Sequence, residues 1–172
     1  ALSGYPFDAN HIKVGMAKSH DLKTITEKHL ITPFNAKAMT LLPERINGKM
    51  AALLTVHTDI PPAKIALALF DKEEDLWSPS YWNAFYASLD SHILPLLRSS
   101  HDHLEIGAPA IKTSQGWLLI YSYIQNYFSG NKIFGIEAVL LDSQNPLKVI
   151  GQLSAPLLVP LSLIHISEPT RP

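Results

Sequence analysis

Residues 105–121 read EIGAPAIKTSQGWLLIY, in which two glycines and a proline separate two apolar runs. The second run, Trp117–Ile124, is rich in β-branched and aromatic residues, as buried strands are. Glycine beside polar residues between two such runs is typical of a tight turn, so we predict a hairpin turn at Ser114–Gly116. A further apolar run, GIEAVLLD, follows at residues 135–142. Short apolar runs separated by turns predict an antiparallel, all-β fold.

The same pattern occurs a second time upstream. Residues 41–56 read LLPERINGKMAALLTV, which is a proline, a short apolar run, a turn and a long apolar run. Asn47-Gly48 is the strongest hairpin sequence in the chain, because both residue types tolerate a positive φ. Pro43 and Pro109 are 66 positions apart, whereas a repeat that forms one small sheet usually takes roughly 40 to 50 residues. We therefore predict an insertion between the two copies.

The insertion is predicted to contain a helix. Ser78 is a favourable N-cap and Pro79 is suited to the first helical position. Large apolar residues then recur at spacings of three and four: Trp82, Phe85, Tyr86, Leu89 and Ile93. We expect this stripe to pack the helix against the strand edges of the sheets. The alternative is that Tyr81 or Trp82 lines a sugar-binding subsite.

The runs at 107–121 and 135–142 resemble the C-terminal half of glycoside hydrolase family 130, and the resemblance extends over residues 11–160. Members of that family cleave β-mannosides on a five-bladed β-propeller, with either phosphate or water as the attacking group. The resemblance implies an all-β fragment of about three blades with one helical insertion, forming a partial domain over residues 1–160. The family's general acid is an aspartate of an N-terminal blade, which we expect upstream of Ala1.

The resemblance also identifies candidate phosphate-binding positions. In the phosphate-using members a lysine, a histidine and a tyrosine contribute to the phosphate site, and they fall on Lys37, Ser122 and Phe134 of this chain. Ser122 can still donate one hydrogen bond, but Phe134 has no polar atom. Charge-assisted hydrogen bonds are each worth on the order of 1.5–3 kcal/mol, so these replacements argue against a phosphate dianion.

Two glutamates stand where the family pattern has small residues. Glu137 interrupts an apolar run, which is costly unless it faces a polar cavity or a partner. The water-using members activate water with glutamates, and an inverting hydrolase needs a base roughly 6.5–9.5 Å from its acid. We therefore expect Glu105 and Glu137 to be catalytic and to face the same central funnel. The alternative is that Glu137 pairs with Lys132 or Lys37 and that Glu105 lies in a solvated loop.

Other polar residues are weaker candidates. We expect His57, at a strand end, and Tyr121 to bind substrate together with Lys37 and Ser122. The alternative for His57 is a partly exposed spacer. Three residues that crowd one loop, His101, Asp102 and His103, have no spacing that suits a metal, so we expect neither a metal nor another cofactor.

The predicted function is inverting hydrolysis of a β-linked mannoside, with an oligosaccharide as substrate. One alternative is a β-mannoside phosphorylase that uses inorganic phosphate, bound in part by Lys37, and releases mannose 1-phosphate. A second alternative, of a different class, is a non-catalytic propeller that binds glycans.

Composition excludes several other classes. The chain has 172 residues, no cysteine and a net charge of −1, which excludes a disulfide scaffold and argues against nucleic acid or an anionic membrane as a partner. It contains no signal peptide and no apolar run long enough to span a membrane, and we expect a cytoplasmic protein. The oligomeric state does not follow from the sequence.

The last twelve residues differ from the rest. Residues 161–172, LSLIHISEPTRP, resemble the translation of a transposase adapter used in DNA library preparation. We expect this tail to lie outside the fold.

Overall fold

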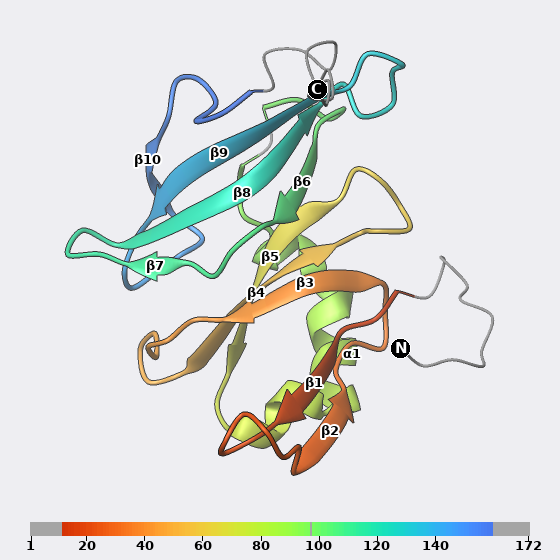
Figure 1. Cartoon of the computed structure of the whole chain (residues 1–172), viewed down its shortest axis with the longest axis vertical. Helices are drawn as coiled ribbons and strands as arrows, with labels where there is room; N and C mark the ends of the chain where they lie inside the picture. The colour runs from red at the N-terminus through yellow and green to blue at the C-terminus, as the bar shows by residue number, and fades with distance from the viewer. Residues whose placement is uncertain (1–11, 97, 160–172) are drawn as a thin grey trace, which may run out of the picture.

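The computed structural model describes residues 12–96 and 98–159, which form a mostly β structure with one α-helix (Figure 1). A two-stranded sheet contains β1 (Gly15–Lys18) and β2 (Glu27–Leu30). A three-stranded sheet contains β3 (Ala36–Leu41), β4 (Met50–Val56) and β5 (Lys64–Phe70). A five-stranded sheet contains β6 (His103–Ile106), β7 (Ile111–Lys112), β8 (Trp117–Gln125), β9 (Ile133–Leu141) and β10 (Val149–Gln152). Between β5 and β6 lie η2 (Glu73–Trp77), α1 (Pro79–Ala87) and η3 (Leu89–His92).

The three-stranded sheet is an antiparallel meander in the order β3-β4-β5. Asn47 and Gly48 form the turn between β3 and β4 with φ values of 50° and 82°. Positive φ at both central residues defines the hairpin turn whose twist matches that of the strands, so the hairpin predicted here is confirmed. Nearly all of β4 is buried, because structure covers both faces of this sheet.

The five-stranded sheet is a second meander, in which β6 and β7 pair with successive parts of β8, followed by β9 and β10. The predicted turn before Trp117 is confirmed, since Thr113 N–H donates to the Gly116 carbonyl across 2.8 Å. Gly116 has a φ of 156°, and a Cβ there would lie 2.1 Å from the carbonyl oxygen of Leu141. Only glycine allows β8 and β9 to approach this closely.

A shared hydrophobic core joins the two larger sheets. Its members come from both of them: Leu53, Ile65 and Leu67 from one sheet, and Leu104, Trp117, Leu119, Tyr121, Tyr123 and Val139 from the other. Strand β6 is also bonded to the three-stranded sheet through its backbone. Leu104 N–H donates to the Ala63 carbonyl at 3.0 Å, and Ile106 N–H donates to Thr55 Oγ1 at 3.0 Å. These bonds fix β6 against the start of the other sheet.

The predicted helix covers the opposite face of the three-stranded sheet (Figure 1). Ser78 caps it, with its Oγ accepting from Tyr81 N–H at 3.3 Å. Trp82 is fully buried and its indole N–H donates to the Leu76 carbonyl at 2.8 Å. The stripe packs the helix as expected, but against a face of the sheet and not against strand edges, and the alternative of Trp82 in a sugar subsite is wrong. The helix ends at Ala87, earlier than the stripe suggested.

The outer face of the five-stranded sheet is apolar and open. Phe134, Ile136 and Leu158 are among its exposed large side chains, and a shallow hollow lies between them and Ser122. Ile136 pairs with Leu158, which extends this surface beyond β9. Contiguous exposed apolar surface of this kind marks a face suited to contact with another layer.

Successive antiparallel meanders are the arrangement that a propeller predicts. The sheets of residues 12–96 and 98–159 do not close into a ring, so the number of blades stays a prediction. The tail at 161–172 lies outside the described residues, and so does Pro160. Within the described ranges, no helix has the length and apolarity needed to cross a membrane.

Candidate functional site

A chain of polar contacts joins the first strands of the two larger sheets. Lys37 Nζ, on β3, lies 2.6 Å from Glu105 Oε1, on β6. His103 Nε2 lies 2.9 Å from the same carboxylate oxygen. The side chains of Lys37 and Glu105 are 36% and 30% exposed, so this ion pair remains accessible to solvent. Glu105 therefore lies in a strand with a charged partner, and the expectation of a solvated loop is wrong.

His103 is held from two sides. Its Nδ1 accepts a hydrogen bond from Ala63 N–H at 2.9 Å, and its ring stacks on Tyr127 with centroids 4.0 Å apart. An Nδ1 that accepts must carry no proton, so Nε2 carries it and donates to Glu105. Burial lowers the pKa of His103 below its usual value, and Lys37 and Lys132 act in the same direction. His103 is thus a neutral donor at neutral pH.

Glu105 is kept ionised by its neighbours. Burial by itself would raise the pKa of Glu105, but hydrogen bonds from Lys37 and His103 outweigh burial and hold the pKa below its ordinary value. Both of these donors bind Oε1, and no described residue donates to Oε2. The result is a fixed carboxylate with one free oxygen and weak basicity.

Glu137 has a different environment. Its side chain is 0% exposed, and its Oε2 lies 2.7 Å from the guanidinium Nη2 of Arg98. None of the described residues donates to its buried Oε1. Burial raises the pKa of Glu137, and Arg98 offsets this only in part. The expectation that Glu137 pairs with Lys132 or Lys37 is wrong, because its ion-pair partner is Arg98.

The two glutamates do not share one site. Glu105 pairs with Ser122 across the strands, whereas Glu137 pairs with Tyr121. Paired residues of an antiparallel sheet point to one face, and consecutive residues point to opposite faces. The expectation that Glu105 and Glu137 face a common funnel is therefore corrected. The catalytic role of each stays a prediction.

The other expected binding residues divide between the same two faces. Tyr121 is buried beside Glu137, and burial followed by the Glu137 charge raises the pKa of Tyr121 to about 12. Its phenol is therefore a hydrogen-bond donor at neutral pH. Ser122 lies on the Glu105 face and lines the hollow with Phe134. Lys37, Glu105 and Ser122 are thus grouped, and Tyr121 is separated from them.

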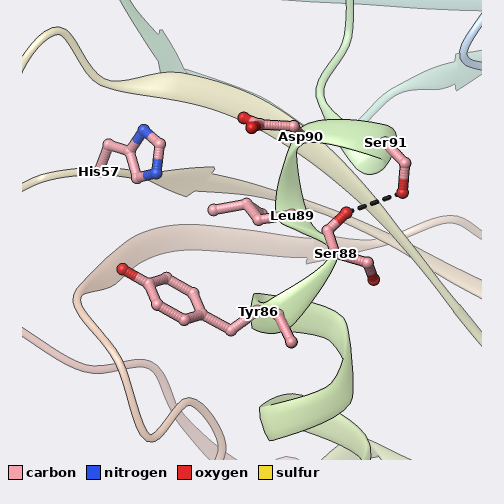
Figure 2. A pocket seen from close by; sticks show the side chains of 7 residues that line it. His57, Tyr86, Ser88, Leu89, Asp90 and Ser91 are labelled. Carbon is pink, nitrogen blue, oxygen red and sulfur yellow. Dashed lines mark hydrogen bonds between the residues drawn. The ribbon is translucent and has the colours of Figure 1, made fainter.

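His57 lies in a pocket of its own (Figure 2). It follows the last residue of β4 with a φ of 59°, which ends the strand. Tyr86 and Asp90, from α1 and η3, line the same pocket. His57 is only partly exposed, and burial lowers its pKa. The imidazole is therefore neutral near pH 7 and can either donate or accept a hydrogen bond.

The loop at His101–His103 holds a structural network. Asp102 accepts a short hydrogen bond from the Tyr123 hydroxyl, and Asn126 N–H donates to its second oxygen at 3.4 Å. The Tyr123 hydroxyl accepts from Arg98 N–H at 3.2 Å. Among the residues that the structure describes, no three His, Asp or Glu side chains are placed to hold a metal ion.

Sequence reasoning missed Arg98 and Tyr127. Arg98 lies in an irregular segment with no motif, and only its contact with Glu137 gives it meaning. Tyr127 follows β8, and its stacking on His103 depends on where the two strands end. The one available signal was the buried glutamate of the apolar run at 135–142, which requires a cationic partner.

The chain matches two curated relatives, both from Thermoanaerobacter sp. (strain X514). It is 30% identical over 155 residues to a 1,2-β-oligomannan phosphorylase and 31% identical over 150 residues to a β-1,2-mannobiose phosphorylase. Each match covers 86% of this chain but only 44% and 43% of the relatives. The chain thus spans less than half the length of the curated relatives it matches. No protein-family model matches the chain.

Two solved structures have a similar fold. A β-1,2-mannobiose phosphorylase from Listeria innocua, in complex with β-1,2-mannobiose, has a TM-score of 0.62 at 22% identity, covering 84% of this chain and 37% of that one. A putative glycoside hydrolase from Bacteroides ovatus has a TM-score of 0.58 at 21% identity, covering 88% and 49%. The curated relatives are named as phosphorylases of β-1,2-linked mannosides, and the two solved structures share the fold of this chain. These relatives bear out the resemblance to glycoside hydrolase family 130 that the sequence pattern carries.

Proposed function

We propose that the complete protein cleaves β-1,2-linked mannosides with inorganic phosphate as the attacking group. A phosphate oxygen would form the new bond to the anomeric carbon as the glycosidic C–O bond breaks. The leaving oxygen would take a proton from a general acid, and the products would be mannose 1-phosphate and a shortened saccharide. Support comes from two relatives that are both named as phosphorylases of β-1,2-mannosides. Hydrolysis, which the sequence favoured, becomes the second candidate.

The observation that carries this proposal is the environment of Glu105. A hydrolase needs a base that removes a proton from water, and such a base works best with a pKa near the operating pH. Lys37 and His103 lower the pKa of Glu105, which makes it a poor base. Glu137 is fully buried, so water has no access to it in this arrangement. Phosphate needs no base, because it is already an anion.

Lys37 would take part by binding phosphate. Its side chain is 36% exposed at the edge of the Glu105 cluster. Ser122, on the same face as Glu105, would add a hydroxyl donor. Further phosphate contacts would come from parts of the complete protein outside the described residues. We also propose that the two larger sheets are blades of a five-bladed propeller, which the similarity to the Listeria innocua fold supports.

Hydrolysis remains the second candidate because of one observation. Glu137 has a raised pKa and an unpaired oxygen, which are the properties of a base. It would act only if the sheets separated enough to admit water.

The test is product analysis of the complete protein with β-1,2-mannobiose, with and without added phosphate. The proposal expects mannose 1-phosphate to accumulate only when phosphate is present. Free mannose at equal rates in both reactions would instead establish hydrolysis. Binding of the disaccharide without either product would leave the glycan-binding alternative.

A further inference from the structure

The hollow beside His57 has the form of a small-molecule site (Figure 2). It lies between the end of β4 and the turn that follows α1. Its lining residues are His57, Tyr86, Ala87, Ser88, Leu89, Asp90 and Ser91. We propose that this pocket binds a neutral hexose unit of an oligosaccharide. The unused hydrogen-bonding groups of the pocket and its charge support this assignment.

Three polar side chains of the pocket are free to bind a ligand. The His57 imidazole, the Tyr86 hydroxyl and the Asp90 carboxylate make no hydrogen bond to any described residue, and Figure 2 shows them around the same opening. The serines differ, because Ser88 Oγ donates to the Ala84 carbonyl at 3.1 Å and Ser91 Oγ donates to the Ser88 carbonyl at 2.7 Å. Unused polar groups that converge on an opening are the usual mark of a binding site.

Packing holds part of the pocket in place. The Tyr86 ring stacks on Phe34 with centroids 4.5 Å apart and planes 25° apart. Leu89 is buried and forms an apolar floor between the polar groups. His57 is fixed where β4 ends. Groups held in place before binding lose little conformational entropy when a ligand arrives.

The charge of the pocket disfavours an anionic ligand. Burial lowers the pKa of His57, as does Lys64, and together they outweigh the opposite effect of Asp90 and Asp59, so the imidazole is uncharged near pH 7. Asp90 is therefore the one formal charge among the lining residues. A phosphate or an acidic sugar would meet this carboxylate and be repelled. An apolar ligand would leave three polar groups unpaired.

A sugar ring meets each requirement. Two neighbouring hydroxyls can donate to the Asp90 carboxylate, while His57 and Tyr86 can each donate or accept. The aliphatic C–H groups of the ring would contact Leu89 and the exposed part of Tyr86, which is 41% exposed. Sugars combine hydroxyls and C–H surface in this way, so the lining fits their chemistry.

The position of the pocket identifies which sugar is expected. His57 follows Val56, and Val56 pairs with Ala36, the neighbour of Lys37. The pocket and the Lys37–Glu105 cluster therefore lie at the same end of the three-stranded sheet. The choice of sugar rests on the proposed function. On that basis the hexose is a mannose unit of the same oligosaccharide, and it lies away from the bond that is cleaved.

The test is isothermal titration calorimetry, in which β-1,2-mannotriose is titrated into the complete protein in the absence of phosphate. We expect Asp90→Asn to raise the Kd about tenfold, because one charge-assisted hydrogen bond is weakened. Tyr86→Phe removes only the hydroxyl and keeps the ring on Phe34, so a smaller rise of about threefold is expected. Asp71→Asn is the matched control, since this exposed residue loses the same charge, pairs with Lys49 and does not line the pocket. Its Kd should stay within twofold of wild type.

The proposal fails if wild type does not bind mannotriose, or if both pocket variants bind it as wild type does. Circular dichroism identifies a variant that misfolds. If Asp90→Asn misfolds, the Kd of Tyr86→Phe tests the proposal. Phosphorolysis of β-1,2-mannobiose is measured in parallel to separate the two proposals. Weakened mannotriose binding in Asp90→Asn, together with no mannose 1-phosphate from wild type, would support the pocket and refute the proposed reaction. Normal phosphorolysis with unchanged binding in both variants would refute only the pocket.

Discussion

Glu105 and Glu137 occupy opposite faces of one sheet, although both stand in its strands. Glu105 is paired with Ser122 and faces the solvent edge, where Lys37 meets it at 2.6 Å. Glu137 faces the core between the sheets, where Arg98 meets it at 2.7 Å. The same side chain is thus made acidic in one place and less acidic in the other. The first three predictions below depend on this contrast.

Glu105→Gln should lower kcat by less than about tenfold, because the proposed reaction uses no general base. It should also lower the KM for phosphate, since Lys37 loses a competing anion. Steady-state kinetics of the complete protein with β-1,2-mannobiose and varied phosphate measure both. A fall in kcat of roughly 10²–10⁴ would instead identify Glu105 as a base. Glu44→Gln, which removes an exposed partner of Lys112, is the control.

Arg98→Met should destabilise the protein, because it leaves the Glu137 charge buried without a partner. Breaking a fully buried pair costs roughly 3–5 kcal/mol, and less is expected here because Arg98 is 34% exposed. Urea denaturation should show a lower midpoint. Adding Glu137→Gln to Arg98→Met should recover most of the loss. No recovery in the double variant would mean that Arg98 acts through its contact with Tyr123.

Glu137→Gln should change the pH dependence of stability. The pKa of Glu137 is raised above its ordinary value of 4.5, so the folded state favours the protonated carboxyl. Wild type should therefore lose stability relative to the variant as pH rises from about 4.5 through the folded pKa. The difference in Tm between variant and wild type, measured from pH 4 to 8, should increase with pH. A difference that shrinks with pH would show that Arg98 dominates over burial.

His103 should remain neutral and carry its proton on Nε2. Ala63 N–H occupies Nδ1, and the pKa of His103 is lowered. Long-range ¹H–¹⁵N correlation spectra should show the Nε2–H tautomer and a titration midpoint below the ordinary value of 6.5. His103→Gln identifies the resonance. A midpoint above 6.5 would mean that Glu105 binds a cationic imidazole.

Gly116→Ala should be more destabilising than Gly48→Ala. Both glycines have positive φ, but a Cβ at Gly116 would lie 2.1 Å from the Leu141 carbonyl oxygen, whereas nothing lies within 4 Å of one at Gly48. The Gly48 variant should lose about 1–2 kcal/mol through backbone strain alone. The Gly116 variant should lose a further 1–3 kcal/mol or so, because β8 and β9 must move apart. Equal denaturation midpoints for the two variants would contradict this.

Local features were predictable from the sequence. The Asn47-Gly48 turn, the Ser78 cap and the turn at Gly116 each depend on the backbone preferences of a few adjacent residues. These preferences act over short distances, so the sequence exposes them.

The candidate site was predictable only in part. Lys37 and Glu105 are 68 positions apart, and their contact depends on how two sheets lie against each other. The faces of Glu105 and Glu137 depend on strand register, where a shift of one residue reverses the side chain. Hydrolysis was expected because Ser122 and Phe134 replace two phosphate contacts. The lowered pKa of Glu105 was not predictable, because it depends on the contacts with Lys37 and His103.

Strand β6 gives one more consequence, for the design of chimeras. Its amides at Leu104 and Ile106 bond to the three-stranded sheet, while its pairing partner β8 belongs to the next sheet. A crossover placed between Phe70 and His103 would separate β6 from the three-stranded sheet, and one placed after Ile106 would separate it from β8. The smallest exchangeable module therefore contains both larger sheets, and recombination libraries should place their junctions outside residues 36–152.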